Sequence, residues 1–141
     1  MIDINSDGKI FVEIENFSEK ELACKHCGKS VIHHSSIVLL QATRYMLNQM
    51  FNKNVRLIVN SGYRCPNHNK AVGGVENSQH TSTIDRIHSR AFDVWSPDIS
   101  TQALFEILKR SNLWTTVLFY EKKNFCHIDN RKRDSIYTEI K

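Results

Sequence analysis

The stretch from Val59 to Val94 constrains the fold of this chain more than any other. It begins as V-N-S-G-Y-R-C-P-N-H-N-K-A-V-G-G-V-E-N-S-Q-H and closes, after a polar insert, on S-R-A-F-D-V. Three of the five glycines lie here with Pro66 between them, so special backbone geometry is concentrated in one place. A long polar loop between two apolar runs is more often functional than decorative. We therefore expect the functional site on this loop.

Histidine and aspartate side chains at the far end of the loop suggest a metal site. His80, His88 and Asp93 lie there, and the later segment C-H-I-D adds His127 on an expected strand. Two histidines and one carboxylate from separated segments suit a zinc ion that keeps a fourth position open for water. The sequence therefore predicts Zn²⁺ as the cofactor.

The ordered motifs resemble a known family. The string S-G-Y-R-C-P-x-H-N-x-x-V-G-G-x-x-x-S-x-H, followed by A-x-D and a late H-x-D, is similar to the M15 zinc peptidases of peptidoglycan. That family includes D-Ala-D-Ala carboxypeptidases and phage endolysins, and its fold is shared by the hedgehog signalling domain. The resemblance covers roughly residues 17–130. It implies an α+β fold in which N-terminal and middle helices pack on one side of a small antiparallel sheet.

The resemblance implies that His80, Asp93 and His127 are the zinc ligands. In the family the aspartate lies seven residues after the first histidine, whereas here the separation is 93 − 80 = 13, so six extra residues intervene. Such an insertion costs little closure entropy, and the motif upstream of His80 is intact, so His80 is favoured. His88, five residues before Asp93, is the alternative ligand.

The catalytic base is the least regular part of the resemblance. Many relatives carry it three residues before the last ligand, but that position is Asn124, which cannot take a proton. A hedgehog-like spacing points to Glu121, six residues before His127, and Asp129 is a second candidate. The alternative interpretation of Glu121 is an exposed charge in a hairpin.

Three further residues are expected at the substrate. The planar guanidinium of Arg64 suits a peptide carboxylate or the oxyanion of a tetrahedral intermediate, although a surface salt bridge is the plain alternative. Ser78 and Tyr63 are the other expected substrate-binding residues.

These assignments predict a zinc metallopeptidase that hydrolyses peptidoglycan stem peptides, with D-Ala-D-Ala and L-Ala-D-Glu bonds both open. The alternative is a non-catalytic cell-wall-binding or structural module that retains the fold. The insert after His80 and the amide of Asn124 favour that alternative.

A second cysteine-rich motif, Cys24-x-x-Cys27-Gly28, has the spacing with which small zinc sites begin. A zinc knuckle completed by His33 or His34 is one interpretation. Adjacent histidines lack the usual gap of about three to five residues, so a pair of half-buried thiols around a glycine turn is favoured.

Composition indicates one domain and a moderately basic surface. The 141 residues, 40% of them hydrophobic, suit a single domain over 1–141 with a possible N-terminal arm over 1–16. A net charge of +4 favours an anionic partner such as a cell-wall polymer. The basic residues are spread out and the cluster at 131–133 is short, so a solvated face is expected there rather than a nucleic-acid site. We also expect a monomer.

Targeting signals are not apparent in the sequence. No apolar run approaches the roughly 20 residues that span a bilayer, and the N-terminus lacks the basic start of a signal peptide. We expect reduced thiols, no membrane partner, and a product that is cytoplasmic or virion-associated before it acts on the cell wall.

Hydrophobic periodicity and capping residues predict the remaining elements. Helices are expected over 19–22 with Ser18 as N-cap, over 36–51 after Ser35 or Ser36, and over 101–111 after Ser100. Strands are expected over 9–16, 55–59, 90–95, 114–120 and 125–129.

Overall fold

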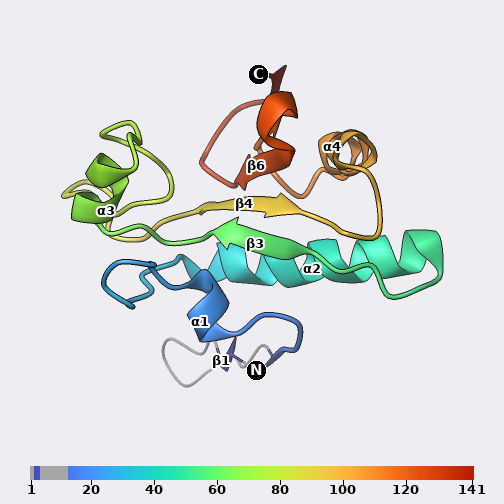
Figure 1. Ribbon diagram of the computed structural model, residues 1–141, viewed down its shortest axis with the longest axis horizontal. Helices are drawn as coiled ribbons and strands as arrows, with labels where there is room; N and C mark the ends of the chain where they lie inside the picture. Colours follow the sequence, from blue (N-terminus) through green and yellow to red (C-terminus); the bar gives the residue numbers. More distant parts are fainter. Residues whose placement is uncertain (1, 4–12) are drawn as a thin grey trace.

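Five strands form the central sheet of this protein (Figure 1). The structure is a computed structural model that describes residues 2–3 and 13–141. The strands lie in the order β3 (Ile58–Ser61), β4 (Ala91–Trp95), β6 (Phe125–Asp129), β5 (Thr116–Tyr120) and β7 (Tyr137–Ile140). All neighbours are antiparallel except β5 and β7, which are parallel. The α+β class is confirmed, but the sheet is mixed rather than wholly antiparallel.

A separate pair of short strands lies at the N-terminus, where β1 (Ile2–Asp3) pairs with β2 (Glu13–Ile14). Ile14 is buried in the main core. The rest of the strand predicted over 9–16, and most of the possible arm, lies outside the described residues.

The helices begin where polar side chains accept hydrogen bonds from free backbone N–H groups. In α1 (Glu19–Leu22) the predicted N-cap Ser18 is present and forms a capping box with Glu21. Ser100 caps α4 (Thr101–Arg110) by accepting from the Ala103 N–H at 3.1 Å. The long helix α2 (His34–Phe51) begins earlier than predicted, because the His33 ring rather than a serine accepts from the Ser35 N–H.

Two shorter helical segments complete the chain. Helix α3 (Pro66–Ala71) follows Cys65, and the 3-10 turn η1 (Glu121–Lys123) connects β5 to β6. Among the helices of the described residues, none has the length and apolar character needed to cross a bilayer.

Alternate residues of the central strands separate a core face from a polar face. Phe92 and Val94 of β4 point into the core, as do Cys126 and Ile128 of β6. The same core cluster contains the buried residues of α2 and α4, namely Ile37, Leu40, Leu47, Leu104, Phe105 and Leu108. The helices therefore pack on one side, as predicted, and the intervening strand residues face the other side.

The edge strand β3 begins three residues later than predicted. The backbone N–H of Val55 donates to Asn48 Oδ1 at 2.8 Å, and that of Arg56 donates to Asp98 Oδ2 at 2.7 Å. Because side chains take these donors, the sheet ladder starts only at Ile58, although Val55 is fully buried.

Gly62 lies where β3 leaves the sheet and passes close to α1. A Cβ atom at this position would lie 2.5 Å from the Leu22 carbonyl oxygen. We expect Gly62→Ala to reduce the free energy of unfolding by about 1–3 kcal/mol, since backbone must move to make room. Urea denaturation at a fixed zinc concentration measures this. The exposed Ser30→Ala serves as control and should stay within about 0.5 kcal/mol of the unaltered chain; an equally small effect for Gly62→Ala would contradict the close approach.

Candidate metal centre

Three side chains on the polar face converge to a small triangle. The Nε2 atom of His80 lies 3.1 Å from Asp93 Oδ1, and the Nδ1 atom of His127 lies 3.2 Å from the same oxygen. The two ring nitrogens lie 3.2 Å apart. These are the three residues that the sequence analysis favoured as metal ligands, and the fold brings them together.

Strand pairing positions two of the three. Asp93 and His127 are directly opposite each other in the antiparallel ladder of β4 and β6. Residues in such a pair have Cβ atoms about 4.5–5.5 Å apart on the same face. Asp93 and His127 are therefore neighbours because of the register of the sheet.

Backbone contacts position the third residue of the triangle, His80. The His80 carbonyl accepts from the Arg64 N–H at 2.7 Å, and the neighbouring Gln79 carbonyl accepts from the Arg90 N–H at 2.8 Å. The loop that carries His80 is thus held between the end of β3 and the start of β4.

Hydrogen bonds behind the two rings fix which nitrogen faces the centre. Nδ1 of His80 lies 2.9 Å from the Gly62 carbonyl oxygen, which can only accept, so this nitrogen carries the proton of the neutral ring. Nε2 of His127 lies 2.7 Å from Asp129 Oδ2 and donates to that carboxylate. The ring nitrogens that face Asp93 therefore carry no proton and present lone pairs.

This arrangement fits a bound cation. Three acceptor atoms facing one another repel in the absence of positive charge. Tetrahedral zinc with bonds of about 2.0–2.1 Å has ligand atoms about 3.3 Å apart, close to the distances of 3.1–3.2 Å found here. The residues present thus suit a zinc ion with three protein ligands.

Charges around the centre shift the pKa values of the acids and of His127. In the metal-free protein, burial raises the pKa of Asp93, but the interactions with the His80 and His127 rings, which include their protonated forms, outweigh burial and hold that pKa well below its usual range. Burial lowers the pKa of His127, whereas its bonds to Asp129 and Asp93 raise it, and the net direction is upward. In the absence of a metal, His127 therefore gains a proton more readily than an ordinary histidine.

Arg131 supports this centre from behind, a role that the sequence analysis missed. Its Nε and Nη2 atoms donate to the two oxygens of Asp129 at 2.9 and 2.6 Å. The pKa of Asp129 is raised by burial, but Arg131 and His127 lower it below the usual range. Arg131 is therefore not part of a solvated basic face, unlike the exposed Lys132 and Arg133. The contact joins the last residue of β6 to a residue two positions later, beyond the end of the strand, so no periodic pattern marks it.

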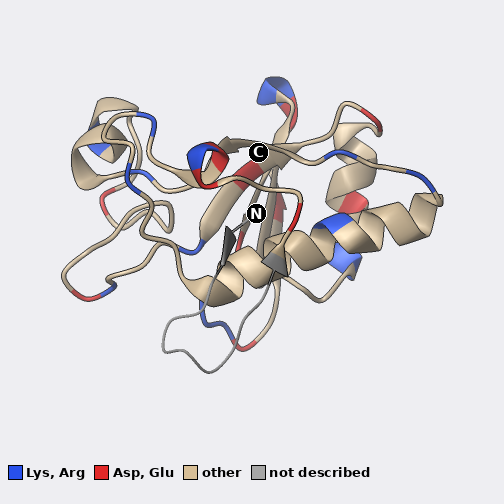
Figure 2. Cartoon of the chain, turned by 90° about the horizontal axis from the view of Figure 1, so that it is seen from below, with Lys and Arg blue, Asp and Glu red and all other residues tan. Residues whose placement is uncertain are grey.

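The metal centre opens into a cavity with a basic wall. The lining includes the basic side chains Lys25, Arg64, Lys123, Arg131 and Lys141. Among the described residues of the lining, Asp93 is the only Asp or Glu. Elsewhere, Lys and Arg lie on several separate loops and elements (Figure 2).

The expected substrate-binding residues have different positions. Arg64 and Ser78 line the cavity. The Nε atom of Arg64 is buried and has no hydrogen-bond partner among the described residues, whereas the Ser78 hydroxyl accepts from the His80 N–H at 3.2 Å. Tyr63 is buried, its hydroxyl lies 3.1 Å from the Ser82 hydroxyl, and it does not line the cavity.

Neither candidate for the base lies free in the cavity. Glu121 is exposed in η1, and it is absent from the cavity lining although the preceding Tyr120 is present. Asp129 is fully buried behind His127, with both oxygens engaged by Arg131. A general base must come within hydrogen-bond reach of the water it activates, so the geometry favours a positioning role for Asp129.

The insert after His80 leaves His88 away from the triangle. His88 is exposed, and its ring meets that of His33 edge-on with centroids 5.9 Å apart. The guanidinium of Arg86 donates to the carbonyls of Ser78 and Thr81, which folds the insert back on itself.

Comparison with known proteins identified one family. The family model described as Peptidase M15 matches residues 15–129, which is more than half of the 141-residue chain. A search of curated proteins found no match.

The two candidate histidines can be separated by metal content. We expect His80→Ala to lose one equivalent of zinc relative to the unaltered chain, because it removes one corner of the triangle. His88→Ala, the matched control, should lose none. Elemental analysis of the dialysed full-length variants measures this. Loss of zinc from His88→Ala with retention in His80→Ala would assign the ligand role to His88.

Proposed function

The chain belongs to the peptidase M15 family, a family of metallopeptidases, and from this premise we propose that it is a zinc-dependent hydrolase of peptidoglycan stem peptides. The observation that carries the proposal is the triangle of His80, Asp93 and His127 at the base of an open cavity. Three protein ligands with a free fourth position are typical of catalytic rather than structural zinc.

When bound, zinc supplies Lewis acidity, which makes water a better nucleophile and polarises the scissile carbonyl. The protein's own groups orient the centre. The Gly62 carbonyl and the Asp129 carboxylate hold the rings of His80 and His127 with their lone pairs toward the cavity.

The basic wall supports an acidic substrate. Burial lowers the pKa of Arg64, but Asp93 and Tyr120 oppose this, and an arginine keeps its charge at neutral pH. Its guanidinium belongs to a side chain that lines the cavity, and it suits a substrate carboxylate or a developing oxyanion. Stem peptides carry free carboxylates, so D-Ala-D-Ala and L-Ala-D-Glu bonds are both compatible with this wall.

The second candidate is a wall-binding or structural module that keeps the fold without turnover. The position of Glu121 outside the cavity and the amide of Asn124 favour it. It retains the metal and the wall contact but predicts no bond cleavage.

Hydrolysis of purified cell walls distinguishes the two functions. We expect the full-length protein to clear a peptidoglycan zymogram, to lose this activity with a chelator, and to regain it with added zinc. His80→Ala should be inactive, whereas His88→Ala should clear normally. Zinc-loaded protein that binds walls but never clears them would instead support the non-catalytic module.

The role of Glu121 is tested by Glu121→Gln, which keeps the size of the side chain. Because Glu121 is exposed and outside the cavity, we expect kcat to change by no more than a few-fold. Release of soluble stem-peptide fragments measures the rate, and zinc content is determined in parallel. A loss of about 10²–10⁴-fold at unchanged zinc content is the signature of a removed general base and would restore Glu121 to that role.

His68 lines the cavity and does not belong to the triangle. The same assay on His68→Gln tests whether its imidazole takes part in hydrolysis.

A further inference from the structure

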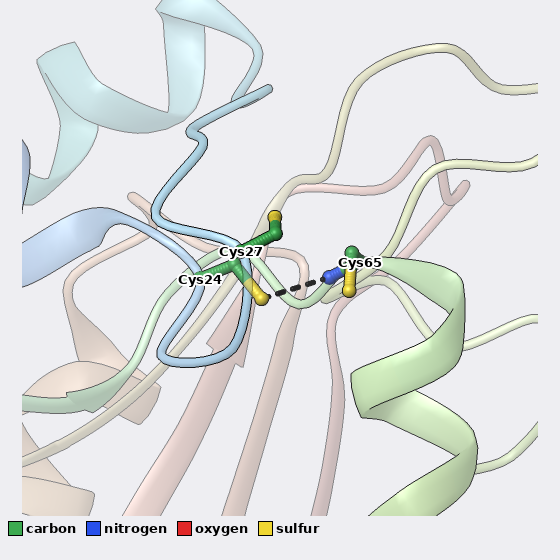
Figure 3. A group of neighbouring side chains, drawn as sticks. All are labelled: Cys24, Cys27 and Cys65. Atoms are coloured by element: carbon green, nitrogen blue, oxygen red, sulfur yellow. Dashed lines mark hydrogen bonds between the residues drawn. The ribbon is translucent and has the colours of Figure 1, made fainter.

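A second group of metal-ligating side chains lies outside the catalytic triangle. The sulfur atoms of Cys24, Cys27 and Cys65 all lie within 4.8 Å of one another. Figure 3 shows the first two on the turn after α1 and the third at the start of α3. Tetrahedral zinc with Zn–S bonds of about 2.3 Å has sulfur atoms about 3.8 Å apart, so only small side-chain movements separate this cluster from that geometry.

The backbone around Cys24 favours a thiolate. The Cys65 N–H donates to the Cys24 sulfur at 3.3 Å (Figure 3). Burial raises the pKa of the Cys24 thiol, but hydrogen bonds from the backbone of Cys65, Cys27 and His26 outweigh it and lower the pKa to about 7. The turn itself is closed by the Gly28 N–H, which donates to the Cys24 carbonyl at 2.9 Å, with Gly28 at a φ of 74°.

A histidine lies beside one of the three sulfurs. Nδ1 of His26 lies 3.5 Å from the Cys65 sulfur. His26 is exposed and lies outside the group of three sulfurs, so its ring must turn to share an ion with them. The histidines suggested by the sequence do not contribute. Nδ1 of His33 is occupied by Ser35 at the start of α2, and the ring of His34 stacks on that of His33.

We propose that Cys24, Cys27 and Cys65, with His26 as fourth ligand, bind a second, structural zinc ion. Three cysteines and one histidine form a closed tetrahedral set with no position left for substrate. An odd number of sulfurs cannot pair off as disulfides, and Cys126 is buried elsewhere with its sulfur 3.9 Å from the Thr101 carbonyl. Soft thiolate ligands select zinc over the hard divalent cations.

This ion would join the N-terminal turn to the catalytic loop. Cys65 follows Arg64, whose backbone N–H holds the His80 carbonyl at 2.7 Å. On the same segment, the Tyr63 N–H donates to the Leu22 carbonyl at 2.9 Å. A metal bond from Cys65 to the turn at Cys24 therefore fixes the backbone that presents Arg64 to the cavity.

The test separates the two metal centres by removing one at a time from the full-length chain. His127→Ala disables the catalytic triangle and leaves every cysteine in place. We expect this variant to retain one equivalent of zinc and, after exchange with cobalt(II), to show a thiolate-to-cobalt charge-transfer band in the near ultraviolet. Cys65→Ser should lose that band while keeping zinc at the triangle.

The fourth ligand is tested by His26→Ala, which should weaken cobalt and zinc binding at the cysteine cluster by at least about 10-fold. His34→Ala is the matched control and should leave binding unchanged. The proposal is overturned if the His127→Ala protein, saturated with cobalt, shows no thiolate band, or if mass spectrometry finds a disulfide between cysteines of the cluster. These readouts need only the His127→Ala chain and so hold even if Cys65→Ser fails to fold. Neither depends on wall hydrolysis, so this site and the proposed function can fail independently.

Discussion

The pairing of β4 with β6 is the constraint on which the candidate metal centre depends. Asp93 opposes His127 in this ladder, while the flanking Phe92 and Ile128 oppose each other on the core face. Because side chains alternate between faces, a slip of one residue would turn the ligands into the core and the apolar residues into the cavity. The register that packs the core is thus the same register that brings Asp93 and His127 together. The hydrophobic stabilisation of the sheet therefore also holds His127 Nδ1 within 3.2 Å of Asp93 Oδ1.

Charge at the centre is arranged in two layers. Behind the ligands, Arg131 neutralises the fully buried Asp129, which leaves that carboxylate free to orient His127 without adding net charge. In front, Asp93 is an ionised carboxylate beside two ring nitrogens that offer lone pairs. A divalent cation bound by this set, with one negative and two neutral side chains, would keep net positive charge, and this is the condition under which a metal activates water and polarises a carbonyl. The basic side chains of the cavity wall add positive charge on the same side of the sheet.

Local signals explain what the sequence could predict. Strand β6 was predicted with its observed bounds because alternation and a turn both mark it, and α4 was predicted to within one residue because Ser100 caps it. Contacts between distant segments were not predictable in this way. No spacing rule connects Cys65 to a turn 41 residues earlier, or the Gly62 carbonyl to a ring 18 residues later. Strand β7 was missed because its exposed residues show no apolar face, and it is held by parallel pairing with β5. The three residues of the triangle were therefore readable from motifs, whereas the groups that orient them required the fold.

The long insert between His80 and Asp93 is compatible with the ligand geometry because each ligand is anchored separately. His80 is held by the Gly62 carbonyl and the Arg64 N–H, both on the segment that leaves β3. Asp93 is held by the ladder of β4. The chain between them carries none of these contacts, and Arg86 closes it against carbonyls next to His80. Lengthening a loop whose two ends are fixed by other segments costs only closure entropy, which grows slowly with length. The distance between the ligands in sequence is therefore free to change while their distance in space is not, so an unusual spacing is not evidence against a shared metal.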